Sequence, residues 1–250
     1  MSSSISLTSR LPVEAFAEQF QREMIPINDF YSYFAAMPLE DSQVQQYVQE
    51  PIAALPPSLH EVLPKVHVVL VPFLERGNKS GDLVAFEKPA ENRQVAATSM
   101  ELGTEVYFFL GVKEEEVADY HYTFYNGLAS LISYRLSDLQ REGFSRVLRE
   151  ELANEAHGEV EEKSWRLKQQ LLRRQTNLLK DTKLQREYFR QAFEDTATLY
   201  LHGLCCDIDV ETGPRQLPTR YLRKRLELLR QVFAPPQGFA LFPEELGRKE

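Results

Sequence analysis

The chain of 250 residues has only two cysteines, Cys205 and Cys206, and they are neighbours in the sequence. Adjacent cysteines can close only a strained ring, so an ordinary disulfide within one chain is excluded. The first ten residues have no cationic start followed by a long apolar stretch, so they do not resemble a secretory signal. Both observations predict a protein of the reducing cytoplasm.

Long apolar runs and turn-forming residues are also scarce. No apolar run approaches the roughly 18–20 residues that a membrane-spanning helix requires, so we expect no contact with a membrane. Glycine (11) and proline (14) are too few for a collagen-like or low-complexity chain. Hydrophobic residues make up 43% of the chain and charged residues 26%, as in a globular protein. We therefore expect a soluble protein that forms its core without disulfides or metals.

The common catalytic motifs are missing. The sequence has no Gly-x-Ser-x-Gly nucleophile turn, no Gly-x-x-x-x-Gly-Lys-Ser/Thr phosphate loop and no Gly-x-Gly-x-x-Gly dinucleotide motif. His60-Glu61 begins a zincin-like pattern, but Pro64 stands where the second histidine is needed. None of the five histidines follows a glutamate at the Glu-x-x-His spacing of a di-iron bundle. Whether the protein is an enzyme therefore stays open at this stage.

Hydrophobic periodicity predicts a chain that is mostly helical. A continuous β-branched run predicts a buried strand over 65–74, with further strands over 82–87 and 105–112. The aromatic stretch 30–37 fits a short helix or an extended segment. Apolar residues at helical spacing predict helices over 11–20, 39–55, 114–136, 137–157, 159–179, 182–206 and 219–233, with an end or kink near Gln49 ahead of Pro51.

This order of helices, sheet and helices indicates an α+β fold. We expect a small antiparallel or mixed sheet at about residues 65–112, packed on a C-terminal helical bundle. The sequence shows no flexible linker near Val112, which favours a single domain over 1–250. The alternative is two sub-lobes, 1–112 and 113–234, followed by a tail over 235–250.

The net charge of −8 is spread unevenly along the chain. Residues 1–135 hold 9 Lys and Arg against 18 Asp and Glu, whereas residues 136–250 hold 20 against 19. Basic residues gather in 162–190, with Lys168 among them, and in 215–230. Such clusters can contact a phosphate backbone or can attract the acidic front half of the chain. The candidates for a nucleic-acid contact are Arg173, Arg174, Arg220, Arg223 and Lys224.

A metal site is the second chemical possibility. His121, Glu155, His157 and His202 lie on or between predicted helices, and a bundle that turned them inward could hold a divalent metal that activates water. The alternative is a solvated acidic face over 150–162 with each histidine hydrogen-bonded in or near the core. The adjacent thiols of Cys205 and Cys206 could act as soft ligands, or they could pack as small apolar groups at a helix end.

These observations favour a non-catalytic interaction or regulatory protein that acts through helical surfaces. Its partner would be another protein or a second copy of the chain. The two alternatives are a metal-dependent hydrolase with a His/Glu site between helices and a nucleic-acid-binding protein that uses the basic helices. No cofactor is predicted, apart from the possible divalent metal.

Overall fold

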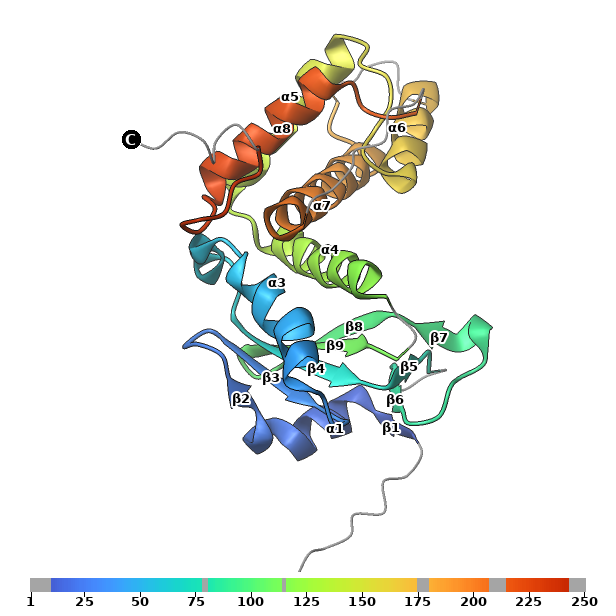
Figure 1. Ribbon diagram of the computed structural model, residues 1–250. Helices are drawn as coiled ribbons and strands as arrows, with labels where there is room; N and C mark the ends of the chain where they lie inside the picture. Colours follow the sequence, from blue (N-terminus) through green and yellow to red (C-terminus); the bar gives the residue numbers. More distant parts are fainter. Residues whose placement is uncertain (1–9, 78–80, 114–115, 175–179, 207–214, 243–250) are drawn as a thin grey trace, which may run out of the picture. The chain divides into compact units, whose positions relative to one another are not determined.

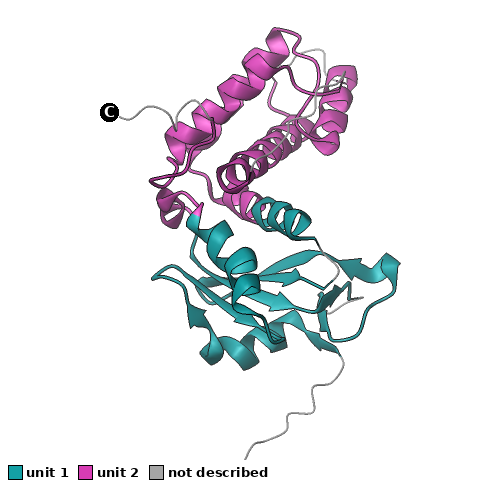
Figure 2. Ribbon diagram, viewed as in Figure 1, with its two compact units in different colours: residues 1–53, 63–127 teal, residues 54–62, 128–250 magenta. Residues whose placement is uncertain are grey.

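A computed structural model describes residues 10–77, 81–113, 116–174, 180–206 and 215–242. The chain forms two compact units, unit 1 (residues 1–53 and 63–127) and unit 2 (residues 54–62 and 128–250), and the boundary falls inside helix α4, Val117–Arg135 (Figure 2). Both sheets lie in unit 1, and four further long helices lie in unit 2, as the predicted α+β class requires. Within the described ranges, none of the helices combines the length and the hydropathy needed to cross a membrane.

The larger sheet of unit 1 is mixed. It contains β2 (Ile25–Pro26), β3 (Tyr31–Ala35), β4 (Lys65–Val71), β9 (Glu105–Gly111) and β8 (Ala97–Leu102), in that order (Figure 1). The β3–β4 and β4–β9 pairs are parallel, and the two outer pairs are antiparallel. Both faces of the central strand β4 are covered, which explains its continuous apolar sequence.

A smaller antiparallel sheet lies beside it in unit 1. Its strands are β1 (Arg10–Pro12), β6 (Leu83–Ala85), β5 (Phe73–Glu75) and β7 (Gln94–Val95). Helix α1 (Val13–Phe20) places Phe16 and Ala17 in a core with residues of both sheets, such as Val69, Leu74 and Phe109. The 3-10 turns η1 (Gln21–Glu23) and η4 (Glu91–Arg93) complete this part of the chain.

The sheets therefore extend beyond the predicted window of 65–112. The aromatic stretch that fitted either a helix or an extended segment is strand β3, and its parallel partner β4 lies far away in the sequence. Short strands such as β1, β2 and β7 carry too few residues to show an alternating pattern.

The second predicted helix forms in three pieces, α2 (Asp41–Val44), η2 (Gln45–Gln49) and α3 (Glu50–Ala53). The middle piece is a π-helical turn directly before Pro51, which confirms the distortion predicted near Gln49. The aromatic face of α4 packs against this segment. The hydroxyl of Tyr120 donates to the carbonyl of Tyr47, and His121 Nε2 donates to the carbonyl of Gln46 over 2.8 Å.

Unit 2 consists of η3 (Pro57–Glu61), the end of α4, α5 (Asp138–Ala153), α6 (Glu162–Arg174), α7 (Lys183–Cys205) and α8 (Thr219–Val232). Ser137 caps α5 in a capping box with Gln140, and the Thr182 side chain caps α7. Helix α5 ends earlier than predicted because Glu155 and Gly158 adopt positive φ values of 52° and 73°. Gly158 is needed there, because a Cβ would lie 2.0 Å from the carbonyl oxygen of Gln216.

Gly127 in α4 provides a test of packing in unit 1. A Cβ at this position would lie 2.0 Å from Cζ of Phe108, whose ring is 2% exposed and cannot move without disturbing the core. We expect Gly127→Ala to lower the free energy of unfolding by about 1–3 kcal/mol, the usual cost of overpacking, in urea unfolding followed by circular dichroism.

The control is Gly143→Ala in α5. A Cβ there meets nothing within 4 Å, so the higher helix propensity of alanine should raise stability by about 0.5–1 kcal/mol. Equal effects of the two substitutions would contradict the close packing of Gly127 on Phe108.

Candidate functional site

The end of α4, the first half of α5 and the start of α7 enclose a cavity of about 600 Å³ in unit 2. Its interior is mostly apolar. Leu136, Phe144, Phe189 and Phe193 form the floor, and the rings of Phe144 and Phe193 meet edge to face at a centroid distance of 5.2 Å. An apolar floor of this kind favours a ligand with an aromatic or aliphatic group.

Four arginines stand around this floor, Arg141, Arg149, Arg186 and Arg190. Arg141 contacts Asp138 at 3.1 Å, Arg149 contacts Glu142 at 2.8 Å, and Arg186 contacts Asp181 at 2.7 Å. Because these side chains are at least one-third exposed, their ion pairs contribute little to stability but hold the guanidinium groups in place.

Two of these arginines also lie over aromatic rings of the cavity. The guanidinium carbon of Arg149 is 5.6 Å from the centroid of Phe189, and that of Arg190 is 4.9 Å from the centroid of Tyr134. Arg190 Nη1 also donates to the Tyr134 hydroxyl. A guanidinium has five N–H donors, so a single ion pair leaves donors that a ligand can use.

The two serines that line the cavity, Ser133 and Ser145, are both buried. No histidine or cysteine is among the residues that line the cavity. Ser133 Oγ lies 2.7 Å from a carboxylate oxygen of Glu194 and 2.8 Å from the Ser130 carbonyl oxygen, and Ser145 is 8% exposed. Since attack by a serine needs an exposed hydroxyl, neither of these two serines is placed to act as a nucleophile.

A buried ion network holds the helices that form the cavity. Arg225 of α8 is 0% exposed and contacts Glu151 of α5 at 2.5 Å and Glu159 at 2.8 Å. Glu159 also accepts from Lys168 of α6 at 3.1 Å and from the Tyr188 hydroxyl of α7 at 2.5 Å. Two carboxylates and two cations balance, so four helices and the segment that carries Glu159 are joined by one neutral network.

The network fixes the ionisation of its central carboxylate. Burial alone would raise the pKa of Glu159, but the charges of Arg225 and Lys168 and the hydrogen bonds from Arg225 and Tyr188 outweigh burial and lower that pKa to about 2. Glu159 therefore stays ionised over the whole physiological range.

Asp195 of α7 is a buried carboxyl that this network does not neutralise. Its side chain is 3% exposed, and Oδ1 accepts from Gln191 over 2.7 Å. Oδ2 has no hydrogen-bond partner among the described residues. Burial raises the pKa of Asp195 to about 6, because its effect outweighs the side-chain interactions with Ser164 and Gln191, which lower the pKa, and repulsion from Glu161 and Glu159 adds to the increase.

Unit 1 contains a row of polar side chains that resembles a catalytic triad in composition only. Ser32 Oγ lies 2.5 Å from His67 Nδ1, and His67 Nε2 lies 3.0 Å from a carboxylate oxygen of Glu105. These residues come from the parallel strands β3, β4 and β9, and the His67 ring stacks on Tyr107. Ser32 is 3% exposed and His67 is 4% exposed, so a substrate carbonyl cannot reach the hydroxyl. The hydrogen bond between Ser32 and His67 joins the side chains of β3 and β4, whereas His67 Nε2 has no hydrogen-bond partner among the described residues. Burial lowers the pKa of His67.

The predicted metal ligands lie in different parts of the chain. Glu155 and His157 are exposed in the segment between α5 and α6, His202 is half-buried on α7, and His121 is buried on α4. Among the described residues, neither Glu155, His157 nor His202 belongs to a group of three potential ligands within 4.8 Å of one another. The metal site stays a prediction.

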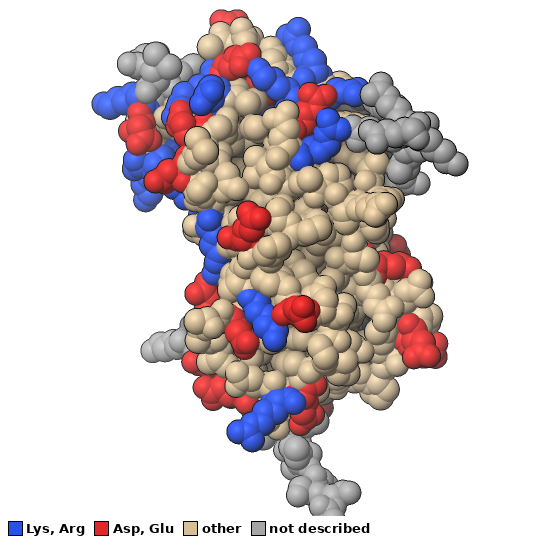
Figure 3. Space-filling view, turned by 90° about the vertical axis from the view of Figure 1, so that its left-hand side faces the viewer, with Lys and Arg blue, Asp and Glu red and all other residues tan. Residues whose placement is uncertain are grey.

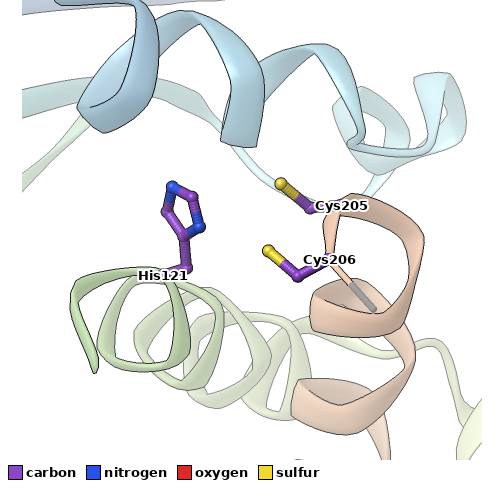
Figure 4. A group of neighbouring side chains, drawn as sticks. All are labelled: His121, Cys205 and Cys206. Atoms are coloured by element: carbon purple, nitrogen blue, oxygen red, sulfur yellow. The ribbon is translucent and has the colours of Figure 1, made fainter. Parts of the chain in front are cut away.

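Cys205 and Cys206 lie at the C-terminal end of α7, and Figure 4 shows them together with His121 of α4. Both cysteines are half-buried and form no disulfide. His121 belongs to unit 1 and the cysteines belong to unit 2, and the positions of the two units relative to each other are not determined. The three residues are therefore not assigned to a common site.

The predicted nucleic-acid contacts are exposed, but acidic side chains accompany them on α8. Arg223 contacts Glu227 at 3.1 Å, and Lys224 contacts Glu150 at 2.7 Å. Figure 3 shows basic and acidic side chains interspersed over the helical unit on the face drawn. The remaining candidates, which are also exposed, are Arg220 at the start of α8 and Arg173 and Arg174 in the last turn of α6.

The buried network corrects two sequence-based expectations. Lys168 does not belong to a solvated basic stretch, and the acidic run 150–162 is not uniformly solvated, because Lys168, Glu151 and Glu159 are each 1% exposed. A signal was present in the sequence. Arg225 lies on the apolar stripe of α8 with Leu222, Leu226 and Leu229, and Lys168 lies on the stripe of α6 with Leu167 and Leu171.

Removal of the Arg225 guanidinium should destabilise the protein strongly. Arg225→Met leaves Glu151 and Glu159 buried with one remaining cation, so we expect the free energy of unfolding to fall by about 3–5 kcal/mol in urea titrations at pH 7. Arg223→Met on the exposed face of the same helix should change it by less than about 0.5 kcal/mol. If both substitutions lowered the free energy of unfolding by similar amounts, the buried network would contribute no more to stability than a surface ion pair.

Asp195 should make stability depend on pH in the opposite sense to a salt-bridged acid. Its pKa of about 6 in the folded protein lies above the ordinary value of 3.8, so the destabilisation that its ionisation causes grows as pH rises from about 4 to 7 and is constant above that range. Asp195→Asn cannot ionise and should be about 1–3 kcal/mol more stable than the wild type at pH 7 but not at pH 3.5. Thermal melts across this range test the difference, with Glu187→Gln on the exposed side of α7 as the control. A pH-independent difference for Asp195→Asn would refute the assignment.

Comparison with known proteins gives no match to a protein-family model, to a curated protein or to a solved structure, so the functional conclusions depend on the geometry of the described residues.

Proposed function

We propose that the protein is a non-catalytic binding protein that recognises a protein partner through the cavity of its helical unit. The observation that carries this proposal is the cavity of about 600 Å³ with a phenylalanine floor and four arginines around it. Concave sites with an apolar interior and a few fixed polar groups are typical binding sites.

One exposed aromatic side chain supports a macromolecular partner. Tyr134 lines the cavity and is 62% exposed, so a partner can cover its ring outside the interior of the cavity. Tyrosine and arginine are also the residue types that dominate binding energy at protein interfaces.

The two other functions predicted from the sequence have weaker support. Hydrolysis at a metal requires ligands that converge, and the predicted ligands on α7 and between α5 and α6 form no such group in the described chain. The predicted nucleic-acid contacts Arg223 and Lys224 form surface ion pairs like those of the cavity arginines, but neither lines the cavity, so its apolar floor does not accompany their charges. The proposal includes a cytoplasmic location, which two thiols without a disulfide support.

A photo-crosslinking experiment in the native cells tests the proposal. Tyr134→p-benzoylphenylalanine places the reactive group at the edge of the cavity, and we expect an adduct of defined mass. The mass distinguishes a second copy of the chain from another protein. The same amino acid in place of Leu172, which is 46% exposed on α6 and does not line the cavity, is the matched control.

The adduct should also depend on the cavity itself. Arg149→Glu reverses one charge at the lining and should reduce the yield from position 134 by about tenfold. No adduct from position 134, or an adduct of equal yield from position 172, would refute the proposed function.

A further inference from the structure

We infer that the cavity of the helical unit binds an acidic peptide segment that places one aromatic or large aliphatic side chain in the cavity, against the wall that Phe144, Phe189 and Phe193 form. This inference rests on the proposed function and names the chemistry of the partner. It follows from the floor, the charge of the rim and the surface beside the cavity.

The apolar residues of the cavity indicate which peptide side chain can enter it. Phe144 and Phe193 are each 4% exposed and Phe189 is 9% exposed, so their neighbours hold them in place and only a small part of each ring borders the cavity. Aromatic rings gain binding energy from edge-to-face and offset contacts in addition to burial. A phenylalanine, tyrosine or leucine side chain suits such a floor, whereas a charged side chain would lose its hydration without a partner there.

The charged residues at the edge of the cavity indicate which charge the peptide should carry on both sides of the side chain that enters the cavity. The lining holds four arginines against three carboxylates, Asp138, Glu142 and Asp181, and the fourth arginine, Arg190, lies 3.8 Å from Glu194 outside the lining. Each carboxylate holds one arginine of the rim. Guanidinium groups held in this way can donate hydrogen bonds to a second carboxylate through their other N–H groups without being reoriented.

Exposed side chains at the edge of the cavity favour a peptide segment over a small molecule as the ligand. The side chain of Arg186 is 65% exposed, and the side chain of Arg141 is 52% exposed. With the exposed side chain of Tyr134, they provide contacts outside the interior of the cavity. A free aromatic acid fills only the interior, whereas a peptide reaches the exposed contacts as well.

Isothermal titration of the full-length protein with synthetic peptides tests the inference. The probe is acetyl-Glu-Asp-Phe-Glu-Glu-amide, and its two matched controls replace every acidic residue by lysine or the phenylalanine by glycine. We expect the probe to bind at least about tenfold more tightly than either control, and we expect its affinity to fall as salt is raised from 50 to 500 mM. The small-molecule arm is 3-phenylpropanoate, which should bind at least about tenfold more weakly than the probe.

A matched pair of protein variants locates the binding. Arg186→Gln should lower the affinity for the probe peptide by about tenfold, because the substitution removes a charged hydrogen-bond donor at the edge of the cavity. Arg166→Gln should leave the affinity within about twofold, because Arg166 has nearly the same exposure and a similar surface ion pair, with Glu162, but does not line the cavity.

The outcomes separate the inference from the function on which it rests. The inference is wrong if the lysine peptide or 3-phenylpropanoate binds as tightly as the probe, or if Arg166→Gln weakens binding as much as Arg186→Gln. If no peptide binds while the photo-crosslinker at position 134 still gives its adduct, the class of ligand is wrong and the binding function stands. If the adduct is missing as well, both proposals fail.

Discussion

Burial of a guanidinium in a protein interior costs free energy that only correctly placed carboxylates can offset, and Arg225 imposes this requirement on the helical unit. The side chain is 0% exposed, and both of its carboxylate partners are almost fully buried. The partners come from α5 and from the segment before α6, and Lys168 of α6 and Tyr188 of α7 complete the network. Sequences far apart in the chain must therefore arrive together for any one of these charges to be tolerated.

The cavity depends on this arrangement because its two main walls are α5 and α7. Glu151 lies on α5 two residues after Arg149, and Tyr188 lies on α7 directly before Phe189. A shift of either helix would separate the rings of the floor and would also break a charged contact in the interior. The ion network thus fixes the spacing of the walls, while the apolar floor supplies the surface that a ligand meets. The stability of the unit and the shape of the site depend on the same helices.

The sequence predicted the helices well and the charged interior poorly, for a physical reason. Apolar stripes and caps such as Ser137 are local signals, so the long helices lie close to their predicted ranges. The pairing of β3 with β4 depends on contacts between distant segments, and so does the meeting of Arg225 with Glu159. The position of Arg225 within an apolar stripe was a visible sign that its charge would be buried. The identity of its partners was not visible, because many carboxylates are available in the chain.

Arginine has two different roles in the helical unit. The buried ion pairs of Arg225 cannot open without a large cost, whereas the exposed ion pairs of Arg141 and Arg186 can. Arg225 is surrounded by protein, so its separation from Glu151 or Glu159 would leave charges without solvent or a partner. Arg186 and Arg141 are more than half exposed, so water replaces Asp181 or Asp138 at little cost when a pair opens. The pairs at the rim can therefore open without a change in the buried network, which holds the helices of the unit together.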